Sequence, residues 1–393
     1  MERSDTGTIS AEQTSLEIKI GQMIMAGVKG TTPGDDARHI VADLRIGNVI
    51  LMGRNIANPA QVLALTRELQ ELAIGELGIP ALIGTDQEGG IVQRLDSAGG
   101  FLPMPDAKTI GSSRNPEAIR AYGLAAGEEL AAVGINLDFA PVLDVNSNPE
   151  NPVIGARGRT FGDTADDVIE TAIPFMLGLR DAGVMACAKH FPGHGNTTED
   201  SHLVLPFQPD DRASLDRVEI PPFREAIAQG IEMIMPAHVT YPALDPSGLP
   251  ATVSKPIVTG LLRDELGFQG VIVTDDFNMQ GIIANFTSGE AAVRAVEAGA
   301  DMILCVRMWE FDGGDPQAAE KIRAALLDAV QSGRLSTDRI DASFNRIVAL
   351  KTSRQIGPAD GSGLDRIRGA EHFRALSRVL DEVAKGRQEA GHP

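Results

Sequence analysis

The chain has 393 residues, 43% of them hydrophobic, and 54 acidic against 35 basic side chains give it a formal net charge of −19. This size allows one large domain or two modest ones. So acidic a composition argues against nucleic acid or an anionic membrane as the main partner, and no apolar run is long enough to predict a membrane-spanning helix. The first fifteen residues are polar and show no secretory signal, which favours the cytoplasm.

Short apolar runs alternate with longer segments of helical spacing, a pattern that predicts βα units and a parallel sheet. Eight strands are predicted, at 21–28, 47–52, 81–85, 136–141, 184–190, 233–237, 271–274 and 302–306. Helices are predicted near 59–77, 116–133, 164–182, 213–229, 256–267 and 288–299, with two or three more towards the C-terminus. In the second helix Asn115 is the expected N-cap, Pro116 the first helical residue and Gly134 the stop.

This alternation predicts an α/β fold consisting of a single (β/α)₈ TIM barrel with additional C-terminal helices. We expect one domain over 1–393, with a core at about 15–352 and a helical extension at 353–393. Cys187 and Cys305 lie inside apolar runs, so we expect buried, reduced thiols. Trp309 is the only tryptophan, and this scarcity of aromatic residues favours a small ligand held by hydrogen bonds over a long polysaccharide.

In such a barrel the active site lies at the C-terminal ends of the strands, so polar residues that follow an apolar run carry most weight. Five groups of this kind are present: Thr85 to Glu88, Asp138 to Asp144, Lys189 with His190, His238, and Thr274 to Asp276. For each group, a structural role at the barrel rim is the alternative to a catalytic role. Their convergence on one mouth of the barrel favours the catalytic role.

The densest segment, at 188–206, places several histidines and acids in a strand end and a long loop. A metal site is one explanation, although no HExxH helix is present, and histidines that cap loop carbonyls are another. A third explanation is an acid/base pair. Asp200 and His202 are separated by one residue, so in an extended loop their side chains leave the same side, and the aspartate can orient the imidazole.

A carboxylate follows the buried run at 271–274. Asp275 at its end can attack an anomeric carbon or stabilise an oxocarbenium-like transition state. The neighbouring Asp276 is better suited to a cap or a hydrogen bond. For the pair taken alone, a helix N-cap is the structural alternative.

Together these segments resemble the single-domain bacterial β-N-acetylglucosaminidases of glycoside hydrolase family 3 over about 18–349. The motifs are DQEGG with VQR at 86–94, NLDFAPVLDV at 136–145, GRTFG at 158–162, KHFPGHG at 189–195, DSH at 200–202 and TDDFNM at 274–279. The resemblance implies that Asp275 is the nucleophile and that His202, oriented by Asp200, is the acid/base. It also implies a set of substrate-binding residues, which are Asp86, Arg94, Arg159, Lys189, His190 and Met279.

Larger family members carry a second α/β domain, and this chain is too short for one, so we expect the acid/base to come from the barrel itself. Asn196 stands where many relatives have aspartate, and we expect it to tune loop packing. The resemblance implies double displacement without a cofactor or metal, on a small carbohydrate such as a muropeptide from cell-wall recycling, by a monomer or homodimer. A phosphorylase, a β-glucosidase and a catalytically silent sugar-binding protein stay open as alternatives.

Overall fold

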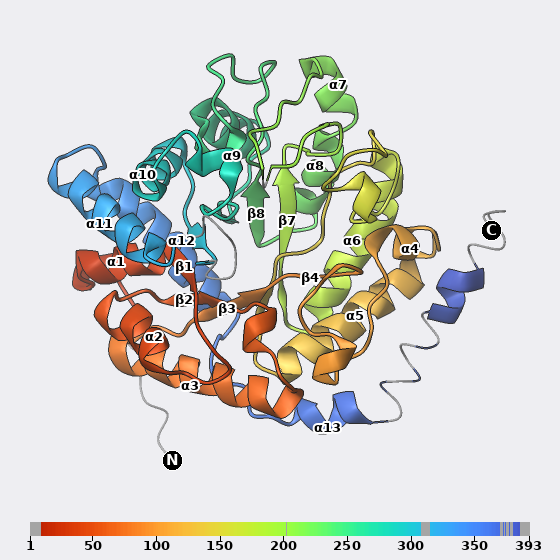
Figure 1. The fold of residues 1–393 in the computed structure, drawn as a ribbon, viewed down its shortest axis with the longest axis horizontal. Coiled ribbons are helices and arrows are strands. Elements are labelled where there is room, and N and C mark those ends of the chain that lie inside the picture. Colours follow the sequence, from red (N-terminus) through yellow and green to blue (C-terminus); the bar gives the residue numbers. More distant parts are fainter. Residues whose placement is uncertain are drawn as a thin grey trace.

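The computed structural model describes residues 9–201, 203–307, 315–369, 372, 374, 377 and 380–385. Its main sheet has eight parallel strands that curl around the centre of the molecule (Figure 1). They are β1 Ile24–Gly27, β2 Asn48–Ile50, β3 Leu82–Thr85, β6 Leu137–Asp138, β7 Met185–Phe191, β8 Met233–Pro236, β9 Val271–Ile272 and β10 Ile303–Cys305. Their order in the sheet is β10-β1-β2-β3-β6-β7-β8-β9. All eight predicted strands are confirmed.

The first and last strands of this order, β10 and β9, meet through an isolated bridge and not through a paired ladder. Val273 and Met302 form one isolated parallel bridge, and the Thr274 N–H donates to the Met302 carbonyl at 2.9 Å. The α/β class and the parallel eight-stranded sheet are therefore confirmed, whereas β9 and β10 are joined by a bridge in place of a paired ladder. A separate antiparallel hairpin, β4 Gln87–Gly89 with β5 Val92–Gln93, follows β3.

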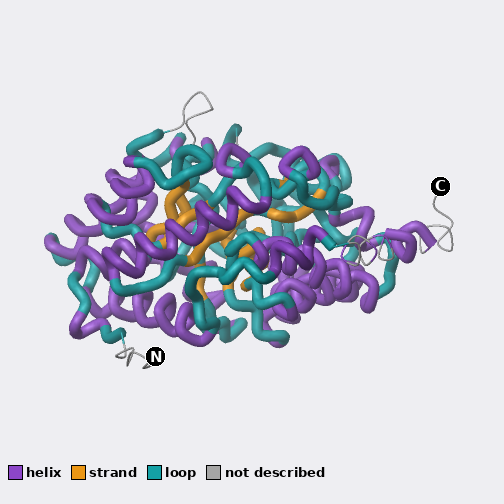
Figure 2. The backbone as a smooth tube through the Cα atoms, turned by 90° about the horizontal axis from the view of Figure 1, so that it is seen from below, coloured by secondary structure: helices purple, strands orange, loops and turns teal. Residues whose placement is uncertain are grey.

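Helices and loops cover the outside of the sheet, as the tube view shows (Figure 2). The α-helices are α1 Leu16–Gln22, α2 Asp35–Arg38, α3 Pro59–Leu77, α4 Ala107–Gly111, α5 Pro116–Ala132, α6 Ala165–Asp181, α7 Arg212–Arg217, α8 Ile220–Ala228, α9 Gln280–Ile283, α10 Ser288–Ala298, α11 Ala318–Gln331, α12 Thr337–Ser353 and α13 Gly363–Arg368. A π-helix spans Pro256–Glu265. Among the described residues, no helix has the length and apolar character needed to cross a bilayer.

Local sequence signals explain most helix ends. Asn115 caps α5 as predicted, because its side chain accepts from the Ala118 N–H at 3.1 Å, and Gly134 adopts φ +78° just beyond the helix. The helix predicted at 213–229 is instead two helices, α7 and α8. Pro221 and Pro222 lack the N–H needed to continue a helix from the residues before them, so the chain starts a new helix there.

At the N-terminal end of β10, a buried ionic cluster ties the outer helix α12 to the sheet. The carboxylate of Asp301 is fully buried and accepts from Ser343 Oγ at 2.8 Å and from Arg346 Nη1 at 2.7 Å. Arg263 also bonds to this carboxylate.

Cys187 and Cys305 are buried free thiols, as predicted. The C-terminal part continues with α13, which packs against α5.

Candidate active site

Ionisable side chains from four strands lie at the C-terminal end of the sheet. Asp86 follows β3, Asp138 ends β6, Lys189 lies in β7, and Asp275 follows β9. Burial raises the pKa of the Cys187 thiol in β7, Lys189 lowers it, and Asp86, Asp138 and Asp275 raise it further. All four ionisable side chains therefore act electrostatically on one buried sulfur. These predicted site residues share one neighbourhood.

Lys189 is the hub of the cluster. Its Nζ lies 2.9 Å from Asp86 Oδ1 and 2.7 Å from Glu88 Oε1, and its side chain is 4% exposed. Arg159 donates two parallel hydrogen bonds of 2.8 Å to the Glu88 carboxylate, and this bidentate geometry fixes both side chains. Burial would raise the pKa of Glu88, but Arg159 and Lys189 outweigh it and hold this pKa below its ordinary value. Burial would lower the pKa of Lys189 and of Arg159, but Glu88 and Asp86 outweigh it and raise both, so both cations stay charged.

The hairpin after β3 positions Arg94. Gln87 Oε1 accepts from the backbone N–H groups of Arg94 and Leu95, at 2.9 and 3.0 Å, and the Gln87 N–H donates to Asp138 Oδ1 at 2.9 Å. Arg94 Nη2 then lies 3.5 Å from Asp86 Oδ2. The side chains of Asp86 and Arg94 are 19% and 25% exposed, so a ligand can reach them from solvent.

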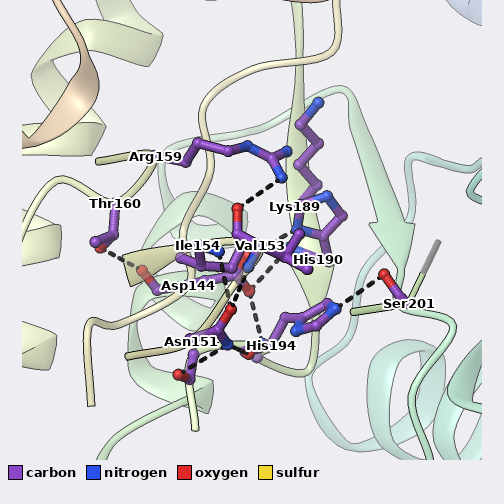
Figure 3. A network of polar contacts seen from close by, with 12 residues as sticks. Asp144, Asn151, Val153, Ile154, Arg159, Thr160, Lys189, His190, His194 and Ser201 are labelled. Atoms are coloured by element: carbon purple, nitrogen blue, oxygen red, sulfur yellow. Dashed lines mark hydrogen bonds and ion pairs between the residues drawn. The ribbon is translucent and has the colours of Figure 1, made fainter. Parts of the chain in front are cut away.

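Two histidines are joined through one buried carboxylate (Figure 3). His190 Nδ1 lies 2.7 Å from Asp144 Oδ2, and the His194 N–H donates to Asp144 Oδ1 at 2.7 Å. Burial would raise the pKa of Asp144, but His190 and the hydrogen bonds lower it below its ordinary value. Burial lowers the pKa of His194 to about 4, so this imidazole is neutral at pH 7. The contact between Asp144 Oδ2 and His190 Nδ1 holds the ring of His190 in one orientation.

Asp275 and Asp276 are adjacent but differ in environment. The Asp276 N–H donates to Asp275 Oδ1 at 2.7 Å, which orients the Asp275 carboxylate. Asp276 is 5% exposed, and its Oδ1 accepts from the Val306 N–H and from Asn278 Nδ2, each at 2.9 Å. Burial raises the pKa of Asp276 to about 6. Asp276 is thus a hydrogen-bonding residue, as expected, and Asp275 is the partly exposed carboxylate of the pair.

The profile of the glycosyl hydrolase family 3 N-terminal domain matches residues 15–350. The chain belongs to glycoside hydrolase family 3. It is 37% identical over 336 residues to beta-hexosaminidase A of Pseudoalteromonas piscicida, covering 82% of this chain and 56% of that protein, so it spans little more than half of that relative. The resemblance inferred from the motifs is confirmed.

Solved structures of the family agree with this assignment. A β-N-acetylglucosaminidase from Paenibacillus sp. str. FPU-7 superposes with a TM-score of 0.86 at 43% identity, covering 94% of this chain and 69% of that one. The β-N-acetylhexosaminidase from Beutenbergia cavernae DSM 12333 gives a TM-score of 0.79 at 34% identity, covering 86% of this chain and 99% of that one.

Two further predicted site residues of this family 3 chain, Asp200 and Met279, lie on loops. Asp200 Oδ2 is 3.8 Å from Arg157 Nη2, while His202 lies outside the described residues. Met279 is 5% exposed, and its N–H donates to the Asp276 carbonyl at 3.1 Å. Asn196 Nδ2 lies 3.1 Å from both carboxylate oxygens of Asp210, a contact between two parts of the loop.

Two central residues of the family 3 site stand in the predicted groups Thr85 to Glu88 and Asp138 to Asp144, but the prediction gave them no individual role. Glu88 joins Arg159 to Lys189, and Asp144 joins His190 to His194. Both residues lie inside motifs on which the resemblance rests, DQEGG and NLDFAPVLDV. The motifs therefore contained them, but residue type alone did not distinguish them from the neighbouring acids.

His238, one of the five predicted groups, has ring contacts with Thr252 Oγ1 at 2.8 Å and the Asp276 carbonyl at 3.2 Å, which hold the strand ends together. Within the described ranges, no three His, Cys, Asp or Glu side chains are grouped to hold a metal ion.

Proposed function

We propose that this family 3 protein is a retaining exo-β-N-acetylglucosaminidase that removes terminal β-linked N-acetylglucosamine from small glycosides. The observation that carries the proposal is the cluster of Asp86, Lys189, Glu88 and Arg159 at the same end of the parallel sheet as Asp275. Such a cluster offers both hydrogen-bond acceptors and donors to sugar hydroxyls, and burial holds its side chains in fixed positions. The names of the relatives, β-hexosaminidase and β-N-acetylglucosaminidase, support this choice of sugar.

In the proposed mechanism, a carboxylate oxygen of Asp275 attacks the anomeric carbon as the bond to the leaving oxygen breaks, and His202 gives its proton to that oxygen. His202 then takes a proton from water, whose oxygen attacks the anomeric carbon and frees the carboxylate. Asp200 would orient the imidazole and support its charged form. The hydrogen bond from the Asp276 N–H supports the role of Asp275 by holding this carboxylate in one orientation.

The geometry of the cluster supports the proposed substrate-binding roles. Asp86 is the partly exposed carboxylate, so we assign it to sugar hydroxyls, with Arg94 and Lys189 beside it as donors. Arg159 and His190 are held from behind by buried carboxylates, and they would donate to the hydroxyl or N-acetyl groups of the bound sugar. Met279 would pack against the sugar from the segment that follows Asp275.

Several finer proposals rest on the sequence. We propose a muropeptide fragment of cell-wall recycling as the natural substrate. A closed (β/α)₈ barrel is supported by the bridge between Val273 and Met302. A single domain over 1–393, a cytoplasmic location and a monomeric or homodimeric state stay predictions.

The test is hydrolysis of p-nitrophenyl N-acetyl-β-D-glucosaminide by the full chain. We expect turnover by the wild type and a loss of at least about 10³-fold in kcat for Asp275→Ala, because the covalent step requires this carboxylate. Asp328→Ala, which removes an exposed carboxylate from α11, is the matched control and should keep wild-type kcat. Equal activity in all three proteins would remove Asp275 from the mechanism.

Two further measurements separate the alternatives. NMR of the first product should show the β-anomer, since double displacement retains configuration, and an initial α-anomer would contradict it. Mass spectrometry of the products formed from N-acetylglucosaminyl-anhydro-N-acetylmuramic acid, with and without phosphate, distinguishes hydrolysis from phosphorolysis. A panel of chromogenic sugars distinguishes the glucosaminidase from a β-glucosidase.

A further inference from the structure

Ser201 stands in the sequence between Asp200 and His202, and it is tied on two sides. Its side chain lies within the protein, with the residue 3% exposed. Ser201 Oγ is 3.2 Å from Nε2 of His194 (Figure 3), and the Ser201 carbonyl accepts from the Gly281 N–H at 3.1 Å. The residue therefore joins two parts of the protein that are distant in sequence.

The first tie leads to the sugar-binding side of the site. His194 is 2% exposed, its backbone N–H is bonded to Asp144, and its Nδ1 lies 2.8 Å from Thr197 Oγ1. His194 is thus fixed at its backbone and at Nδ1 before its Nε2 meets Ser201. Asp144 also holds His190, so Ser201 is connected to a proposed substrate-binding residue through the side chain and the backbone of His194.

The second tie leads to the segment that carries Asp275. Gly281 belongs to α9, which begins five residues after Asp275 at Gln280. A Cβ built on Gly281 would lie 2.9 Å from the Ser201 carbonyl oxygen and 3.3 Å from that of Val204. Only glycine lets the two segments approach this closely. An N–H in the first turn of a helix has no partner within the helix, and here a loop carbonyl satisfies it.

We propose that Ser201 is a positioning residue: its bonds to His194 and to α9 hold the chain on either side of it, so that the acid/base of the proposed mechanism meets the leaving oxygen. This inference rests on the proposed function. Adjacent Cα atoms are about 3.8 Å apart, so fixing Ser201 restricts where both neighbours can lie. A displacement of about 1 Å at a proton donor is enough to lower a rate by about 10²-fold.

The dependence of rate on the leaving group separates positioning of the acid from general damage. A poor leaving group needs a proton as the bond breaks, whereas 2,4-dinitrophenolate leaves without one. Ser201→Ala removes the hydroxyl that meets His194 and keeps the carbonyl that meets Gly281. We expect kcat/KM to fall by about 10- to 100-fold for methyl N-acetyl-β-D-glucosaminide and by less than about threefold for the 2,4-dinitrophenyl glycoside. The p-nitrophenyl glycoside should lie between.

Two companion variants complete the test. Ser201→Thr retains the hydroxyl, so it should restore the response to poor leaving groups. Ser343→Ala is the matched control, because it also removes a buried serine hydroxyl and its hydrogen bond, but beside Asp301 at the opposite end of the sheet. It should lower the melting temperature while leaving the ratio of rates between the two glycosides as in the wild type.

The outcomes distinguish this inference from the proposed function. If the wild type cleaves none of the three glycosides, the proposed function fails. If the wild type is active and Ser201→Ala slows all three equally, or slows none, the positioning role is overturned. If Ser201→Ala does not fold, judged by circular dichroism, the same ratio is measured for Gly281→Ala, which crowds the other contact. A ratio equal to that of the wild type would then overturn the proposal.

Discussion

Glu219 is a buried acid behind the proposed catalytic loop, and its replacement by glutamine tests the electrostatics of this region. The residue is fully buried, and its Oε1 accepts from Ser147 Oγ at 2.9 Å. A Cβ on Gly193 would lie 2.3 Å from Oε2, so this carboxyl packs directly under the KHFPGHG segment. Burial, with Asp144 nearby, raises the pKa of Glu219 to about 8.

The sign of the effect on stability follows from this raised pKa. The folded protein holds the proton of Glu219 up to about pH 8, whereas the unfolded chain releases it near pH 4.5. The contribution of Glu219 to the free energy of unfolding is therefore fully present below pH 4.5 and is lost as the pH rises to 8. Each pH unit inside this window costs about 1.4 kcal/mol. Between pH 5 and pH 7 this contribution to the free energy of unfolding should therefore fall by about 2 to 3 kcal/mol in the wild type, and the glutamine variant should not show this loss.

The assay is urea unfolding of the wild type and Glu219→Gln at pH 5 and pH 7. The free energy of unfolding of the variant, relative to the wild type, should rise by about 2 to 3 kcal/mol between these pH values. Glu71→Gln, an equal change of charge at an exposed position on α3, should show no comparable rise. A difference between Glu219→Gln and the wild type that is the same at both pH values would refute the reasoning.

Two further predictions concern the site and the loop beneath it. Arg159→Lys cannot keep both bonds to Glu88, so we expect KM to rise about tenfold or more, and an unchanged KM would show that the paired geometry is dispensable. Gly195→Ala would bring a Cβ to within 1.7 Å of the Val145 carbonyl oxygen, so we expect a loss of about 3 kcal/mol or more in chemical unfolding. Gly75→Ala in α3 meets no atom within 4 Å and should be neutral or slightly stabilising; equal effects of the two changes would contradict the packing argument.

The elements of the fold were predictable because their signals are local. The buried run at 271–274 and the cap at Asn115 are visible within a few residues, and both are confirmed. The split of the predicted helix at 213–229 was missed, although the two prolines that cause it were in view. Helical spacing on both sides of the break gave a single pattern, so periodicity alone favoured one helix.

The pairing of side chains in the site could not be read from local pattern. Lys189 meets Glu88 across the sheet, and the bond depends on the register of strands that are a hundred residues apart in sequence. Asp144 was quoted within a motif, yet its bonds to both histidines depend on how the loop folds back over it. Residue types and strand ends predicted which residues gather, and tertiary contacts determine which of them pair.

The central claim is that Asp275 forms a covalent bond with the sugar, and trapping that bond is its most direct test. A 5-fluoro-N-acetylglucosaminyl fluoride carries a good leaving group for the first step, while its ring fluorine slows the second, so the intermediate should accumulate. Peptide mass spectrometry should find the sugar on the peptide that contains Asp275, and Asp275→Ala should give no adduct. An adduct on a different carboxylate, or wild-type hydrolysis by Asp275→Ala, would contradict the account.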